Sequence, residues 1–162
     1  FDYIRAAADA FPRFDNAYGA PDGGLDLLPK PTGQRLPLLV TGGSRQPPDW
    51  VAANADGWIT YPRGVAQQAE AGRDWRARTA EQGGAEKPVT QSLYIDLDPD
   101  PDAPPQPIHL GFRSGWKPLR DYLKALEEIG VNHVALNLRF NRADVEATLD
   151  DLARDVLPAF TA

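Results

Sequence analysis

Residues 37–44 read PLLVTGGS, an apolar run that ends in two glycines and a serine. Residues 57–62, GWITYP, repeat the pattern with a second short strand and a second turn. Pro47 and Pro48 suit the first turn of a helix, where a missing N–H costs nothing. In a parallel α/β architecture the carboxyl ends of the strands face one site, so we expect both turns to line the same ligand.

A strand followed by a helix recurs four times along the chain. The expected strands cover 36–41, 57–60, 89–97 and 133–138, and the expected helices cover 47–55, 64–82, 116–129 and 141–160. Right-handed crossovers make such a sheet parallel. A complete (β/α)₈ TIM barrel needs about 250 residues, so four units in 162 residues predict an α/β fold that is half of one.

The later helices carry the clearest signals. Residues 116–129 place leucines, a tyrosine and an isoleucine on one helical face, and Gly130 follows where a C′ residue belongs. For the last helix we expect Asn141 as the N-cap, with Asp144 in a variant capping box. Its expected apolar face is Val145, Leu149, Leu152, Val156 and Phe160. Five prolines within 98–107 predict a stiff extended loop, and the chemically mixed residues 108–115 are expected to be a further loop before the next helix.

Composition narrows the class of protein. With 42% apolar and 25% charged residues, the chain is expected to form a single globular domain over 1–162. A net charge of −6 without a basic stripe argues against nucleic acid, and no apolar run approaches the roughly 20 residues that span a bilayer. No Cys is present, and cytoplasm is the expected location. The chain begins at Phe1 inside a helix-like segment, so we expect a fragment of a longer protein.

Three segments together suggest a family. They are PLLVTGGS at 37–44, ADGWIT at 55–60 and GVNHVAL at 130–136. Their order and spacing resemble the C-terminal half of luciferase-like flavin-dependent monooxygenases. The resemblance implies reduced FMN, or a deazaflavin in one branch, acting with dioxygen on a small organic substrate. It also implies a flavin reductase as partner and a homo-oligomer, with the N-terminal half of the barrel missing from this chain.

The first turn is the expected phosphate site, formed by Thr41, Gly42, Gly43, Ser44 and Arg45. Glycines let backbone amides approach a phosphate, Ser44 adds a hydroxyl donor and Arg45 adds charge. The positive end of the helix at Pro47 points the same way. A tight turn that needs positive φ explains the glycines equally well from the motif alone, and the family resemblance favours the phosphate.

Thr60, Tyr61, Pro62 and Arg63 follow the second strand at the same end of the sheet. The resemblance implies contacts with the flavin ring here, and Tyr61 can stack on it. Aromatic pairs in strands are more often packing, so we expect Trp58 to belong to the core. Arg63 either meets a phosphate or caps its own loop.

His109, Arg113 and Arg139 are the expected substrate contacts. His109 and Arg113 lie in the mixed segment before the third of the four helices, and Arg139 follows the fourth strand. Each has a structural alternative: a solvated loop histidine, or an arginine paired with a carboxylate. His133 opens the fourth strand at the opposite end and is expected to be structural. The pattern singles out no catalytic residue.

Other readings of the same motifs are weaker. Gly42, Gly43 and Ser44 could form the nucleophile elbow of a serine hydrolase, but Gln46 stands where the motif requires a second glycine. A noncatalytic half barrel could instead bury its open edges against a partner or a second copy. The aspartates at 96, 98, 100 and 102 lack the glycine and glutamate of a calcium loop, so no metal site is expected.

Overall fold

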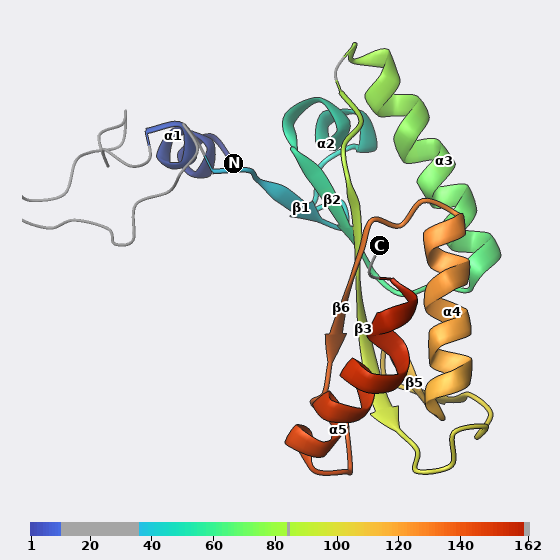
Figure 1. The fold of residues 1–162 in the computed structure, drawn as a ribbon. Coiled ribbons are helices and arrows are strands. Elements are labelled where there is room, and N and C mark those ends of the chain that lie inside the picture. Colours follow the sequence, from blue (N-terminus) through green and yellow to red (C-terminus); the bar gives the residue numbers. More distant parts are fainter. Residues whose placement is uncertain (11–35, 84, 161–162) are drawn as a thin grey trace, which may run out of the picture.

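The computed structural model of the chain describes residues 1–10, 36–83 and 85–160 (Figure 1). The loops expected at 16–24 and 29–34 lie outside these ranges. The helices are α1 Asp2–Ala10, α2 Pro48–Asn54, α3 Val65–Glu81, α4 Trp116–Glu128 and α5 Val145–Asp151, which continues as a π-helical turn and a 3₁₀ turn to Ala159. The strands are β1 Leu39–Thr41, β2 Gly57–Thr60, β3 Val89–Leu97, β4 Gln106–Ile108, β5 Gly111–Ser114 and β6 His133–Asn137.

Within the six-stranded sheet, β1, β2, β3 and β6 pair in parallel in that order, which confirms the four strands expected from the sequence. The bounds of β2 and β3 are those predicted, whereas β1 begins three residues later than expected, at Leu39. All four strands run in one direction, so their carboxyl ends lie at one edge of the sheet. The predicted half barrel is therefore observed, and its turns lie where ligands bind in such folds.

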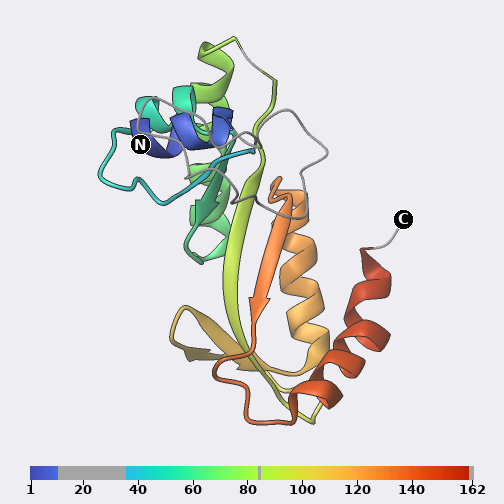
Figure 2. The ribbon, with the colours of Figure 1, turned by 90° about the vertical axis from the view of Figure 1, so that its left-hand side faces the viewer.

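The loop expected over 98–115 is wrong in its second half. Residues 106–114 form the hairpin β4–β5, and β5 pairs in parallel with the end of β3, where Tyr94 is opposite Gly111 and Asp96 is opposite Arg113 (Figure 2). Proline 107 is tolerated because β4 is the edge strand of the hairpin. The two strands are short and are joined by a turn at Leu110, so their apolar and polar residues do not alternate over a stretch long enough to predict strands from the sequence.

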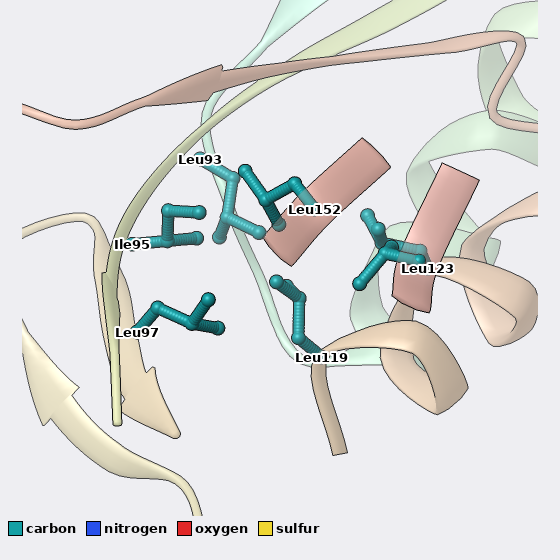
Figure 3. Packing of buried hydrophobic residues seen from close by; sticks show 7 residues of the cluster. Leu93, Ile95, Leu97, Leu119, Leu123 and Leu152 are labelled. Atoms are coloured by element: carbon teal, nitrogen blue, oxygen red, sulfur yellow. The ribbon is translucent and has the colours of Figure 1, made fainter. Parts of the chain in front are cut away.

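Two hydrophobic cores lie between the sheet and its helices. The larger unites Leu93, Ile95 and Leu97 of β3 with residues of α4 and of the C-terminal helical turns (Figure 3). The smaller unites β1, α2 and Trp75 of α3, and it takes Val89 from the start of β3. Helices α3 and α4 lie on the same side of the sheet (Figure 1). Strand β3 contributes buried residues to both cores.

The start of the last helix also differs from the prediction. Asp144, not Asn141, is the N-cap, and its side chain accepts a hydrogen bond from the amide of Ala147. The Asn141 side chain instead accepts from the amide of Leu97 and donates to Thr148. Of the expected apolar face, Leu152 and Val156 are buried, whereas Val145 and Leu149 are about half exposed.

Candidate functional site

The turn after β1 is fixed to the neighbouring strand. The amide of Gly42 donates to the carbonyl of Ile59 at 2.8 Å, and the indole Nε1 of Trp58 donates to the carbonyl of Gly42 at 2.9 Å. The hydroxyl of Ser44 donates back to the carbonyl of Thr41 at 2.8 Å. The Gly42 amide, which the sequence predicts as a phosphate donor, is therefore occupied within the sheet.

The rest of the turn is strained and has free donors. Ser44 and Arg45 have φ values of 45° and 62°, in the left-handed region that residues other than glycine seldom adopt. In the described part of the chain the amides of Gly43, Ser44 and Arg45 have no acceptor, and these three residues are exposed. Backbone strain of this kind collects at ligand sites, so the three amides are the donors available to an anion.

Helix α2, which follows this turn, contributes fewer free amide donors than the sequence predicts. Pro47 and Pro48 have no N–H, and the amide of Val51 already bonds to the carbonyl of Pro47. Helix α2 is only seven residues long. The first turn of α2 therefore offers only the amides of Asp49 and Trp50, and the other donors of this region are those of the turn after β1.

The turn after β2 lies against the first turn, as the sequence predicts. The Tyr61 ring is half exposed and comes within 3.4 Å of the position that a Cβ on Gly42 would occupy. Behind the glycines, Gly42, Gly43 and Arg63 line a cavity of about 180 Å³, together with Trp58 and residues of α2 and α3. Trp58 stacks on Trp75 at 5.6 Å, which confirms its packing role.

Arg63 caps its own loop. Its Nη1 donates to the hydroxyl of Thr60, to the carbonyl of Tyr61 and to Oε1 of Gln68. Thr60 is buried and faces this arginine rather than an open cavity. Pro62 lines a separate cavity of about 410 Å³ next to the hairpin. The loop-capping alternative for Arg63 is thus present in the structure.

Two of the three expected substrate residues lie together. His109, in the hairpin turn, is 6.0 Å from the Tyr94 ring and 6.1 Å from the Phe140 ring, measured between centroids. The guanidinium of Arg139 lies 5.8 Å from the centre of the same Phe140 ring. This aromatic cluster lies at the carboxyl ends of β3 and β6. The sequence did not single out Tyr94 or Phe140, because neither belongs to a recognisable motif.

Arg113 is placed differently, in an ion-pair network. Asp96, 2% exposed, receives bonds from Arg113 at 3.0 Å and Arg142 at 2.7 Å, and Arg113 also pairs with Asp98 at 2.6 Å. Burial raises the pKa of Asp96, but hydrogen bonds from Arg142 and Arg113 outweigh it and lower that pKa below its usual value. The network joins β3, the hairpin and the loop before α5, as the carboxylate-paired alternative for Arg113 requires.

A buried polar seam between the two cores was not anticipated. Thr60, Gln68, Gln91 and Tyr122 meet there; Gln91 donates to the Tyr122 hydroxyl at 3.1 Å, and that hydroxyl donates to the carbonyl of Arg63. Burial raises the pKa of Tyr122, and the bond from Gln91 opposes the rise. Nε2 of Gln68 and Oε1 of Gln91 are buried without a partner in the described residues. Isolated glutamines on helices and strands give no sequence signal of such a seam.

Other kinds of site are not assembled by the residues that the structure describes. Across 1–10, 36–83 and 85–160, no three histidine or carboxylate side chains gather to hold a metal ion. The ring neighbours of His109 are Tyr94 and Phe140, so within these ranges it does not serve Ser44 as a base. No helix in the same ranges is long and apolar enough to cross a membrane.

Comparisons with known proteins identify the fold. No family model matches the chain, and no curated protein matches it in sequence. Among solved structures it is similar to an F420-dependent secondary alcohol dehydrogenase in complex with an F420-acetone adduct, with a TM-score of 0.68 and 16% identity over 99% of this chain and 60% of that one. It is also similar to the coenzyme F420 dependent tetrahydromethanopterin reductase of Methanopyrus kandleri, with a TM-score of 0.61 and 13% identity over 78% of this chain and 51% of that one.

Two further structures whose names mention no cofactor are also similar. DmoA from Hyphomicrobium sulfonivorans aligns with a TM-score of 0.59 and 15% identity, and the long-chain alkane monooxygenase LadA with 0.58 and 11%. Each alignment covers 90% of this chain and 45% of the other. The chain thus spans between 45% and 60% of the length of these four proteins. The chain has the TIM-barrel type of fold of these four proteins and corresponds to about half of such a barrel.

Proposed function

We propose that this chain is part of a flavin-dependent oxidoreductase of the luciferase-like type, which uses reduced FMN and dioxygen to oxidise a small organic substrate. A deazaflavin is the alternative cofactor, and two of the similar structures are named for F420. The observation that carries the proposal is the strained turn after β1, where the amides of Gly43, Ser44 and Arg45 stand exposed without acceptors in the described residues.

The residues present fit the phosphate tail of such a cofactor. Three neighbouring amides and the Arg45 side chain favour an anion, and the turn is held in place by Thr41 and Trp58. Tyr61 stands beside Gly42 with its ring half exposed, as a wall for a planar group. A bound reduced flavin would supply the two electrons that activate dioxygen, of which one oxygen atom enters the substrate and the other leaves as water; the protein supplies binding and orientation.

The substrate contacts in this proposal are His109 and Arg139. Both border the Phe140 ring at the carboxyl ends of the strands, where barrel enzymes place their substrates. Arg113 is held by two carboxylates, so its contribution is to position the hairpin that carries His109. A flavin reductase partner and a homo-oligomer belong to the same proposal.

The test is binding by the whole chain, with a ligand pair that differs only in the phosphate. FMN and riboflavin are titrated against the protein and followed by flavin fluorescence, and F420 is titrated in parallel. We expect FMN or F420 to bind at least about tenfold more tightly than riboflavin, as charge-assisted hydrogen bonds to a phosphate require. Equal affinity for all three would overturn the phosphate site.

A variant then tests whether the phosphate binds at the turn after β1. Gly43 has a φ outside the left-handed region, and a Cβ there would meet the carbonyl of Gln46 at 3.3 Å, so Gly43→Val requires that carbonyl to shift by a few tenths of an ångström. It should weaken FMN binding about tenfold and leave riboflavin unchanged, because it covers the amides. Ala66→Val, at an exposed position on α3, is the matched control. Unaltered FMN affinity in Gly43→Val would remove the turn from the proposal.

A further inference from the structure

The edge of β3 that faces β2 is not paired along its whole length. β2 pairs with β3 up to Gln91, and β5 pairs with it from Tyr94 onward, so Ser92 and Leu93 lie between the two partners. Figure 2 shows β2 and the hairpin on the same side of β3, one beyond the other. The sheet thus has an interruption two residues long on this edge.

A cavity of about 410 Å³ lies at this interruption. One wall is the segment Pro62–Gly64 after β2, and the other is formed by the hairpin and the prolines before it; Leu93 and Tyr122 also line it. The volume is in the range of small-molecule sites, which are typically apolar with a few fixed polar groups. This cavity is distinct from the exposed turn at Gly43–Arg45, which does not line it.

Arg63 is the one charged residue among the described residues that line this cavity. No carboxylate in the described part of the chain pairs with it, and its hydrogen bonds all start from Nη1, which leaves Nε and Nη2 without acceptors there. The guanidinium is held by Thr60 and Gln68, each 1% exposed. The guanidinium also lies over the Trp58 ring, 5.9 Å from its centre, and a fixed guanidinium that no carboxylate neutralises favours an anion.

A second unmet donor lies next to this arginine. Oε1 of Gln68 accepts a hydrogen bond from Arg63, whereas Nε2 of Gln68 is buried with no acceptor in the described residues. Buried donors are rarely left unpaired, and those that are require an explanation such as a bound water or ligand. Gln68 does not line the cavity, so its amide adds to the polar surroundings of Arg63 and is not a contact for the ligand.

We infer that this cavity binds a small organic acid, with its carboxylate against Arg63 and its apolar body against Phe112 and the prolines of the hairpin wall. The walls supply apolar contact area, and Arg63 selects the charge. Arg63 also borders the smaller cavity behind Gly42 and Gly43, but the inference does not depend on the proposed flavin site, because the amides of Gly43, Ser44 and Arg45 take no part in it and its test involves no flavin.

The experiment compares two probes of equal shape on the full chain without flavin. 2-Naphthoate and its neutral amide, 2-naphthamide, are titrated by calorimetry. We expect one molecule of naphthoate per chain and binding at least about tenfold weaker for the amide, the size of one charge-assisted hydrogen bond. Equal binding of the two probes, or no saturable binding of naphthoate, would refute the inference.

Variants locate the binding. Arg63→Gln should weaken naphthoate about tenfold and leave naphthamide unchanged, whereas Arg73→Gln, an exposed arginine on α3, should change neither. Gly64→Leu should weaken both probes, because its backbone suits any residue and nothing lies within 4 Å of the added Cβ, so the side chain can enter the cavity without unfolding the protein. Naphthoate affinity that stays the same in both Arg63→Gln and Gly64→Leu would place the acid elsewhere.

Discussion

Asp96 of β3 and Arg113 of β5 are direct neighbours across the two strands, and their side chains are joined by an ion pair of 3.0 Å. Arg142 bonds to the same carboxylate from the loop before α5. One buried side chain therefore holds together three segments that border the aromatic cluster of Tyr94, His109 and Phe140.

Replacing Asp96 by Asn should destabilise the protein by about 2 to 3 kcal/mol, because two arginines lose a buried anionic partner. Urea unfolding measures the change. Asp121→Asn is the control, since that carboxylate is 70% exposed and 3.4 Å from Arg120; it should shift stability by less than about 0.5 kcal/mol. A similar loss in both variants would contradict a special role for Asp96.

The same carboxylate should make stability depend on acidity. The folded protein lowers the pKa of Asp96 below its usual 3.8. Its contribution is therefore complete above about pH 4 to 5 and is lost as the pH falls through the folded pKa, because the unfolded chain takes up the proton first. Urea unfolding at pH 6 and pH 3 should show a larger loss for the wild type than for Asp96→Asn. Parallel losses would show that other carboxylates dominate.

Gly111→Ala should prevent the hairpin from docking. A Cβ at Gly111 would lie 1.8 Å from the carbonyl oxygen of Tyr94, a backbone atom that cannot move aside within the sheet. We expect a loss of about 3 kcal/mol or more, or detachment of the hairpin. Gly64→Ala, with nothing within 4 Å, is the matched control and should change stability by less than about 1 kcal/mol. Hydrogen exchange at β5 distinguishes local detachment from global unfolding.

Trp58→Phe should loosen the proposed phosphate turn. Phenylalanine can retain stacking on Trp75 but cannot donate to the carbonyl of Gly42. Stability should fall by about 1 kcal/mol, and FMN affinity should fall while riboflavin affinity stays constant. Trp50→Phe serves as the control, because Trp50 packs against the same core without a bond to this turn. An unchanged ratio of FMN to riboflavin affinity in Trp58→Phe would show that the turn needs no anchor.

The sequence predicts the parallel strands and long helices well because their signals are local. The β-branched and aromatic residues of β3 and the leucine spacing of α4 fix the bounds of these two elements within a residue. The hairpin was missed because its strands are short and rich in proline and polar residues. The N-cap was misassigned because Asn141 and Asp144 are both good caps, and the bond from Leu97 to Asn141 depends on the packed fold.

The candidate site divides in the same way. The meeting of the two turns follows from strand order alone, so Gly43, Ser44 and Tyr61 could be placed together from the sequence. Arg113 pairs with Asp96, and the amide of Gly42 bonds to the carbonyl of Ile59. Each partner is 17 residues away in the sequence, so no local pattern predicts either contact. The burial of Gln68 and Gln91 cannot be predicted from the sequence for the same reason, because it depends on residues that are distant along the chain.

The polar seam between the two cores has a consequence for motion. The cores have no buried apolar residue in common, and β3 passes from one to the other with Gln91 between Val89 and Leu93. Polar contacts tolerate opening in water better than apolar ones, so the unit of β1, β2, α2 and α3 can fluctuate open while α4 and the C-terminal turns stay closed on β3. The proposed phosphate turn lies within that unit, so its occupancy would slow solvent exchange there and leave the other half unaffected. The proposed acid site is walled by Arg63 on one side and by Phe112 and Tyr122 on the other, so its occupancy would tie the two halves together and slow exchange in both.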